Sequence, residues 1–143
     1  MYADYEFYTD VFFGVAISEA DFPRLSSRAS DFLDYYTRGK AAGVTEEPVL
    51  TAVKKACCAV AELIQTDEQA KALAAKATET ALASDMGEIK SETVGSWSQT
   101  YATASDYSRS GNAAAAVRDA RMAYAEAARE YLSNTGLLYR GGC

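Results

Sequence analysis

The sequence contains no histidine among its 143 residues, and this absence removes the commonest general base and the commonest metal ligand. It also excludes every Ser-His or Cys-His pair that could activate a nucleophile. No glycine-rich phosphate loop, nucleophile elbow or calcium-binding loop is present either. We therefore expect a chain without catalytic residues, metal ligands or cofactors.

Basic residues are also scarce. The chain has 14 Lys and Arg against 20 Asp and Glu, which gives a formal net charge of −6 at pH 7. Sequence-independent DNA binding depends on basic side chains that neutralise phosphates. This balance of charges therefore argues against a dedicated nucleic-acid-binding protein.

Long apolar runs and an even set of cysteines are missing too. The longest unbroken apolar run, from Ala56 to Ala61, is too short to cross a membrane, and the acidic N-terminus does not resemble a signal peptide. Three cysteines are an odd number, and the neighbours Cys57 and Cys58 rarely form a disulfide. We expect a reduced, cytosolic protein in which these two cysteines serve as small hydrophobic core residues.

The composition is otherwise that of a globular protein, with 49% apolar and 24% charged residues. A chain of this length forms one domain and can build one core without metals or disulfides. Only two prolines and abundant alanine favour helix. Together with the helical patterns described next, the composition predicts an all-α single domain, residues 1–143, that forms a small helical bundle with its helical core at about 3–83 and 112–133.

The first half of the chain has three helical patterns. Residues 3–13 form a short helix that ends near Gly14, whose missing Cβ suits a helix C-terminus. The second pattern begins with capping residues at 18–21 and closes at Gly39. The third begins at residues 45–48, where acidic side chains complement the helix dipole.

Two further helices are predicted later in the chain. Residues 66–69 read Thr-Asp-Glu-Gln and match a capping box, so we expect a new helix to start there and to continue to about Ala83. Asn112 caps the last helix, which ends at residues 134–136. The shared helical period of these segments predicts the following core residues: Phe22, Leu25, Phe32, Leu33, Val53, Cys57, Val60, Ile64, Val117, Tyr124 and Tyr131.

Two segments outside the helices carry large apolar side chains. Residues 88–111 change to a two-residue period, which predicts an extended arm or β-hairpin between the helical halves. Residues 134–143 form a C-terminal tail. Such side chains either fold back on their own domain or fill the surface of a partner. We predict an interface formed by Val94, Trp97, Tyr101, Leu137, Leu138, Tyr139 and Arg140.

Carboxylates occur in pairs at two places. Asp31 and Asp34 lie on the polar side of the second predicted helix, and Glu46 and Glu47 lie in the first turn of the third. Both positions are typical of solvated surface. We therefore interpret neither pair as an active site.

Several stretches of the sequence resemble one family, the head-to-tail connector (adaptor) proteins of tailed bacteriophages. The resemblance covers essentially the whole chain apart from residues 66–87. It rests on an N-terminal Tyr-x-x-Tyr-x-Phe-Tyr block, on the pattern of Ile17 to Asp34, on Val53 to Glu62, on Ile89 to Tyr101, and on the ending Tyr131 to Gly142.

The resemblance implies a ring of identical subunits, a dodecamer, in the neck of the virion after assembly in the host cytoplasm. Its partners would be further copies of itself, the portal protein, and a downstream head-closure or tail-completion protein. DNA would pass through the ring without specific binding, and no membrane would be involved. The alternative is a small intracellular helical regulatory or accessory protein that binds a single partner.

Binding to DNA tests the charge argument. We expect the dissociation constant for duplex DNA to exceed about 1 µM at physiological salt, because the chain has too few basic groups to release many counterions. Fluorescence anisotropy with a labelled duplex measures this value. Sub-micromolar binding would contradict both the charge argument and the passage of DNA through the ring.

Overall fold

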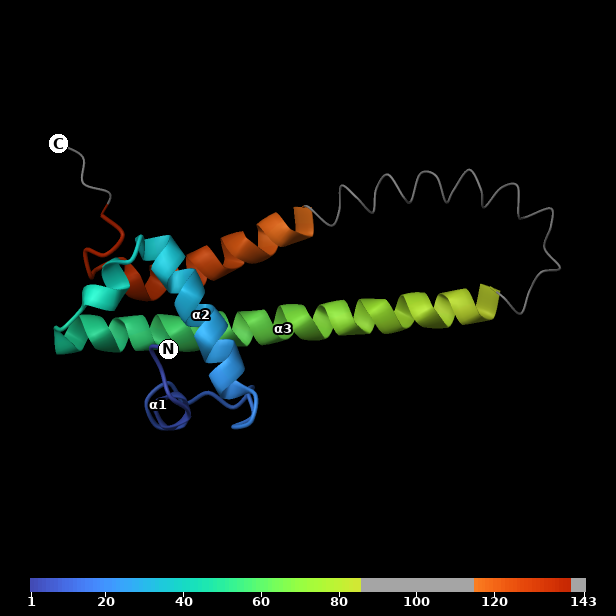
Figure 1. Ribbon diagram of the computed structural model, residues 1–143, viewed down its shortest axis with the longest axis horizontal. Coiled ribbons are helices and arrows are strands. Elements are labelled where there is room, and N and C mark those ends of the chain that lie inside the picture. Colours follow the sequence, from blue (N-terminus) through green and yellow to red (C-terminus); the bar gives the residue numbers. More distant parts are fainter. Residues whose placement is uncertain (86–114, 140–143) are drawn as a thin grey trace. The chain divides into compact units, whose positions relative to one another are not determined.

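The computed structural model describes residues 1–85 and 115–139 of the chain (Figure 1). The described residues form α1 (Tyr5–Asp10), α2 (Phe22–Thr37), the short 3₁₀ helix η1 (Lys40–Gly43), α3 (Glu47–Asp85) and a C-terminal helix, residues 115–132. These residues contain no strand, so the all-α class is confirmed for them. The predicted arm, residues 88–111, lies outside the described residues.

The chain divides into two compact units. The first unit consists of Met1–Asp67 with Arg121–Cys143, and the second consists of Glu68–Ala120.

Helix α1 ends earlier than the sequence pattern predicted, at Asp10. The Asp4 carboxylate caps it by accepting a hydrogen bond from the Phe7 amide at 3.1 Å. After the helix, the residue in the left-handed region is Phe13, with φ 59°, and not Gly14. Gly14 is required for a different reason: a Cβ there would lie 2.0 Å from a carbon of the Tyr8 ring. The glycine therefore lets the chain pass directly over this ring.

Helix α2 has the bounds that its capping residues predicted. At its start, the Ser18 hydroxyl donates to the Asp21 carboxylate at 2.8 Å and accepts from the Asp21 amide at 3.3 Å. At its end, Arg38 and Gly39 both adopt left-handed conformations, and the Gly39 amide donates to the Asp34 carbonyl at 2.7 Å. This hydrogen bond satisfies a carbonyl of the last turn and reverses the chain into η1.

Helix α3 is continuous from Glu47 to Asp85, so the predicted restart at Thr66 is wrong. The Thr66 hydroxyl donates to the carbonyl of Glu62 at 2.9 Å, a hydrogen bond typical of a helix interior. A capping box needs a non-helical residue at its first position. Neither proline nor glycine interrupts the chain between Pro48 and Gly87, and alanine, lysine and glutamate favour continued helix.

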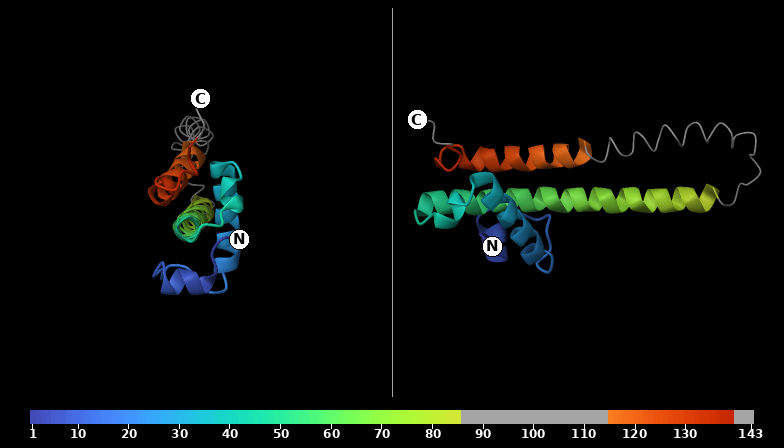
Figure 2. Two further views of the ribbon diagram at one scale, coloured as in Figure 1. Left: turned by 90° about the vertical axis from the view of Figure 1, so that its left-hand side faces the viewer. Right: turned by 45° about the horizontal axis from the view of Figure 1, so that its top comes forward.

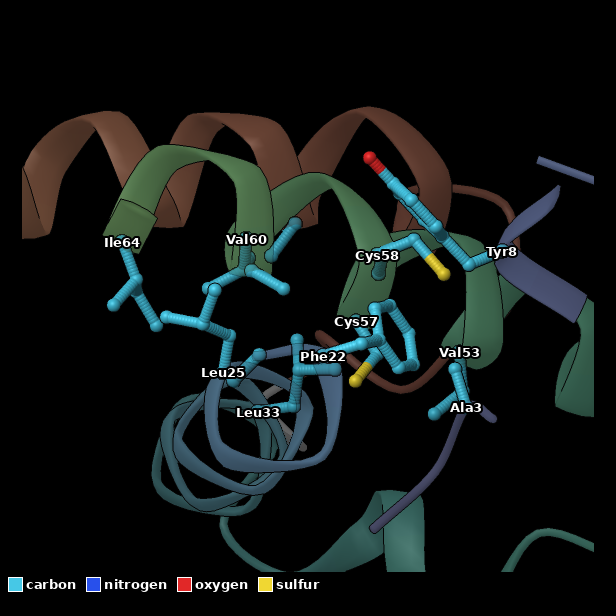
Figure 3. Close-up of a cluster of buried hydrophobic side chains, with 14 of the residues drawn as sticks. Ala3, Tyr8, Phe22, Leu25, Leu33, Val53, Cys57, Cys58, Val60 and Ile64 are labelled. Carbon is cyan, nitrogen blue, oxygen red and sulfur yellow. The ribbon is translucent and has the colours of Figure 1, made fainter. Parts of the chain in front are cut away.

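The core of the first unit lies between α2 and α3, where the side chains of the two helices interdigitate. Figure 3 shows Phe22 and Leu25 of α2 directed toward α3, and both residues are at most 1% exposed. Small residues at the crossing allow close approach, since the Cys57 sulfur lies 3.6 Å from the Ser26 hydroxyl and 3.5 Å from that of Ser30. The crossing of the two helices is visible in Figure 1.

The two buried serines also hold the N-terminal residues. The Ser26 hydroxyl donates to the Ala3 carbonyl at 2.7 Å, and the Tyr2 amide donates to the Ser30 hydroxyl at 2.9 Å. Among the described residues, every buried side-chain oxygen and nitrogen has a hydrogen-bond partner. The serines therefore satisfy backbone groups of an extended segment that has no strand beside it.

The C-terminal helix completes this unit on another side of α3 (Figure 2). Its Ala128 and Leu132 are fully buried, and the ring of Tyr124 meets the ring of Phe32 edge-on with 5.6 Å between their centroids. The Tyr124 hydroxyl donates to the Asp67 carboxylate at 3.2 Å. This hydrogen bond and the ring contact join the helix to both α2 and α3.

Seven of the predicted core residues are buried: Phe22, Leu25, Leu33, Val53, Cys57, Val60 and Ile64. Phe32, Tyr124 and Tyr131 are only partly buried, because their rings lie at the edge where the C-terminal helix meets the core. Val117 is 50% exposed, so its assignment to the core is wrong. It precedes Arg121, the residue at which the C-terminal helix enters the unit that contains the core.

Replacement of Gly14 tests the close contact with Tyr8. Gly14→Ala should lower the free energy of unfolding by about 1–3 kcal/mol, because the buried ring must shift to make room for the methyl group. Gly43→Ala is the matched control, since no atom lies within 4 Å of its added Cβ. Chemical denaturation measures both variants, and equal stabilities would contradict the contact.

Candidate interaction surface

Tyr8 determines where the loop after α1 lies. Its side chain is fully buried, and its hydroxyl donates to the Glu62 carboxylate at 2.7 Å while it accepts from the amides of Ala16 and Ile17 at 3.0 and 3.1 Å. The pKa of Tyr8 is raised above its usual value, mainly because the side chain is buried and secondly because its hydroxyl donates to Glu62. The phenol therefore stays neutral and able to donate at physiological pH.

The loop that Tyr8 holds presents apolar side chains to solvent. Phe13 is 77% exposed, Val15 is 97% exposed and Val11 is 43% exposed. Phe12, which lies between Val11 and Phe13 in the sequence, turns inward, and its ring centroid is 6.4 Å from that of Tyr131. We call the exposed set of Val11, Phe13 and Val15 the apolar loop. The sequence pattern assigned residues 11–13 to the first helix and so did not reveal this surface.

The first residues of the C-terminal tail fold back on the core of the first unit. Gly136 adopts φ 74°, and the Thr135 hydroxyl donates to the Leu132 carbonyl at 2.7 Å, which turns the chain away from the helix axis. Leu137 and Leu138 are partly buried against the core, whereas Tyr139 is 66% exposed. The two leucines thus have the position that the fold-back alternative expects, and Tyr139 remains accessible.

A cavity of about 220 Å³ lies between this tail and the end of α2. The tail side is formed by Leu137, Leu138 and Tyr139, and the other side is formed by Tyr36, Thr37, Arg38 and Lys40. The Lys40 ammonium group donates to the Tyr139 carbonyl, which ties the tail to the loop after α2. We call this cavity the tail groove.

The tail groove has the composition of a protein interface. Tyrosine and arginine are enriched in the central residues of interfaces, and both occur here beside leucine. Next to it, Tyr35 is 74% exposed, and Asp34 accepts a hydrogen bond from the Tyr2 hydroxyl. Asp34 is therefore partly buried, and not simply a solvated surface carboxylate as the sequence pattern indicated.

Cys57 and Cys58 are both buried free cysteines. Burial raises the pKa of the Cys58 thiol to about 12, so this thiol is protonated at neutral pH. Glu46 and Glu47 are exposed at the start of α3. Within residues 1–85 and 115–139, no group of three or more His, Cys, Asp or Glu side chains could hold a metal ion.

The structure describes only part of the predicted interface. Leu137, Leu138 and Tyr139 come together at the tail groove. Val94, Trp97, Tyr101 and Arg140 lie outside the described residues, and their role stays a prediction. Among the helices of the described residues, none is both long and apolar enough to cross a membrane.

Comparison with known proteins assigns the chain to no family. No protein-family model matches the sequence, and no curated protein or solved structure matches it.

Proposed function

We propose that this chain is a structural subunit of a phage virion, an adaptor that assembles as a ring and joins the portal to the tail. In this role its partners are other copies of itself, the portal protein and a head-closure or tail-completion protein. DNA passes through the ring without specific binding. The chain acts through surfaces and not through catalysis.

The observation that carries the proposal is the resemblance to head-to-tail connector proteins, taken together with where its residues lie. The stretch from Ile17 to Asp34 includes α2 from Phe22 up to Asp34, and the stretch from Val53 to Glu62 lies on α3. Their apolar positions are the ones that pack against each other in the core of the first unit. The stretches on which the resemblance rests therefore correspond to packed core helices of this chain.

The exposed aromatic and apolar residues add support. Phe13 and Tyr35 are each more than 70% exposed, and Tyr139 is 66% exposed. Aromatic groups of this size contribute strongly to binding when a partner covers them. Three exposed aromatic side chains on one small unit favour a protein that functions in contact with other proteins.

Assembly on the portal protein tests the proposal. Purified full-length chain and purified portal rings of the same phage should form a complex with many copies of this chain per ring, seen by light scattering and electron microscopy. Tyr139→Ser should weaken incorporation at least tenfold without lowering the melting temperature of the free chain, because this side chain is exposed. Met122→Ser, which changes a side chain of similar exposure (64%), should have no effect.

Two results would speak against the adaptor role. Failure to bind the portal at any ratio would contradict it directly. Capture of one copy by a single partner, with no ring, would instead favour the regulatory or accessory alternative.

A further inference from the structure

We propose that the apolar loop of one copy inserts into the tail groove of a second copy, with Phe13 as the inserted side chain. The inference rests on the proposed assembly role and names the two surfaces through which neighbouring copies meet. Both surfaces belong to the first unit of the chain. The contact is therefore between the same compact unit in every copy.

Phe13 is held in a conformation that ordinarily disfavours a bulky residue. Its φ of 59° lies in the left-handed region, where a side chain with a Cβ is strained, and yet 77% of its surface is exposed. Packing of the Phe13 ring within the chain does not offset this strain, because little of the ring contacts other residues. Such backbone strain is concentrated at binding and switching sites, and here its effect is to point an aromatic ring into solvent.

The tail groove has room for an aromatic ring, and part of its lining is apolar. Its volume is about 220 Å³, and an engineered apolar cavity of about 150 Å³ is large enough to bind benzene. The volume is too small for a typical drug-sized ligand, whose pockets begin at about 300 Å³. Leu137 and Leu138 supply apolar surface, and Tyr36 offers a ring against which a second ring can pack.

The charges around the two surfaces are complementary. Residues 1–21 contain five acidic side chains and no Lys or Arg, and Asp10 is exposed directly before the apolar loop. The tail groove is bordered by Arg38 and Lys40. Copies of a chain with net charge −6 repel one another at long range, so opposite charges placed face to face favour association. The acidic N-terminal segment and the basic side chains at the groove are such a pair.

The two surfaces lie at opposite ends of α2. The Tyr8 ring that supports the apolar loop lies 4.9 Å from the ring of Phe22, the first residue of this helix, whereas the tail groove is lined by Tyr36 and Thr37 at its end. Sixteen helical residues separate the ends by about 24 Å. One molecule cannot satisfy both surfaces by itself. Contacts between different surfaces of identical copies are head-to-tail, and they close into a ring or continue as a filament.

A pair of complementary variants tests the contact. Phe13→Asp removes the inserted ring and leaves the groove intact, whereas Arg38→Glu inverts the charge of the groove and leaves the loop intact. In sedimentation velocity up to about 1 mM, the wild-type chain should associate, and each variant alone should bind itself at least tenfold more weakly. An equimolar mixture of the two variants should form dimers that do not grow further, since only one working loop faces one working groove.

Two controls separate loss of contact from loss of fold. Phe13→Gly also removes the ring but suits the left-handed backbone, so it should lose association with no decrease in melting temperature. Leu73→Ser changes an exposed apolar residue that belongs to neither surface, and it should associate as the wild type does.

Three outcomes would overturn the proposal: a wild-type chain that stays monomeric throughout, variants that associate as well as the wild type, or a mixture that remains monomeric. If Arg38→Glu lost only portal binding, the groove would belong to another protein, and the self-contact would also be wrong. Portal binding is measured separately. A chain that binds the portal but not itself through these residues contradicts this inference alone, and the converse contradicts the adaptor role alone.

Discussion

The first unit depends on the buried side chain of Tyr8, which joins segments far apart in the sequence. Its hydroxyl links the loop amides of Ala16 and Ile17 to the Glu62 carboxylate on α3. A hydrogen bond to an ionised carboxylate is among the stronger ones, and here it also gives a partly buried charge a donor. Because the ring lies under Gly14, the same residue fixes the path of the apolar loop. The Tyr8 side chain thus both packs in the core and determines the position of the exposed apolar loop.

The sequence was sufficient to predict the helices wherever local chemistry and core packing agree. The caps of α2 and the apolar spacing from Phe22 to Leu33 specify the same helix, and the buried positions from Val53 to Ile64 follow the helical period. The placement of Leu137 and Leu138 was left open between fold-back and docking, and the structure places them against the core. The helical fold of the described residues is therefore largely a local property of the chain.

The other features of the structure could not be predicted from the sequence because they depend on contacts between distant residues. Nothing near Gly14 indicates that a ring six residues earlier occupies the space of its Cβ. The capping box at Thr66 was outweighed by the helix-forming residues on both sides. Exposure of Phe13 was not predicted for the same reason, since the sequence pattern placed this residue in the first helix and its true position depends on that of Tyr8. The tail groove joins segments about 100 residues apart, which no local pattern can show.

Tyr8→Phe tests most directly whether one hydroxyl controls the loop, because it keeps the ring and removes only the hydrogen bonds. Hydrogen exchange at the Ala16 and Ile17 amides, measured in the full-length protein, should accelerate at least tenfold, which corresponds to about 1.4 kcal/mol for the lost hydrogen bonds. Amides in the middle of α2 should change much less, and self-association should weaken even though Phe13 is still present. Unchanged exchange at these two amides, or unchanged association, would contradict the account.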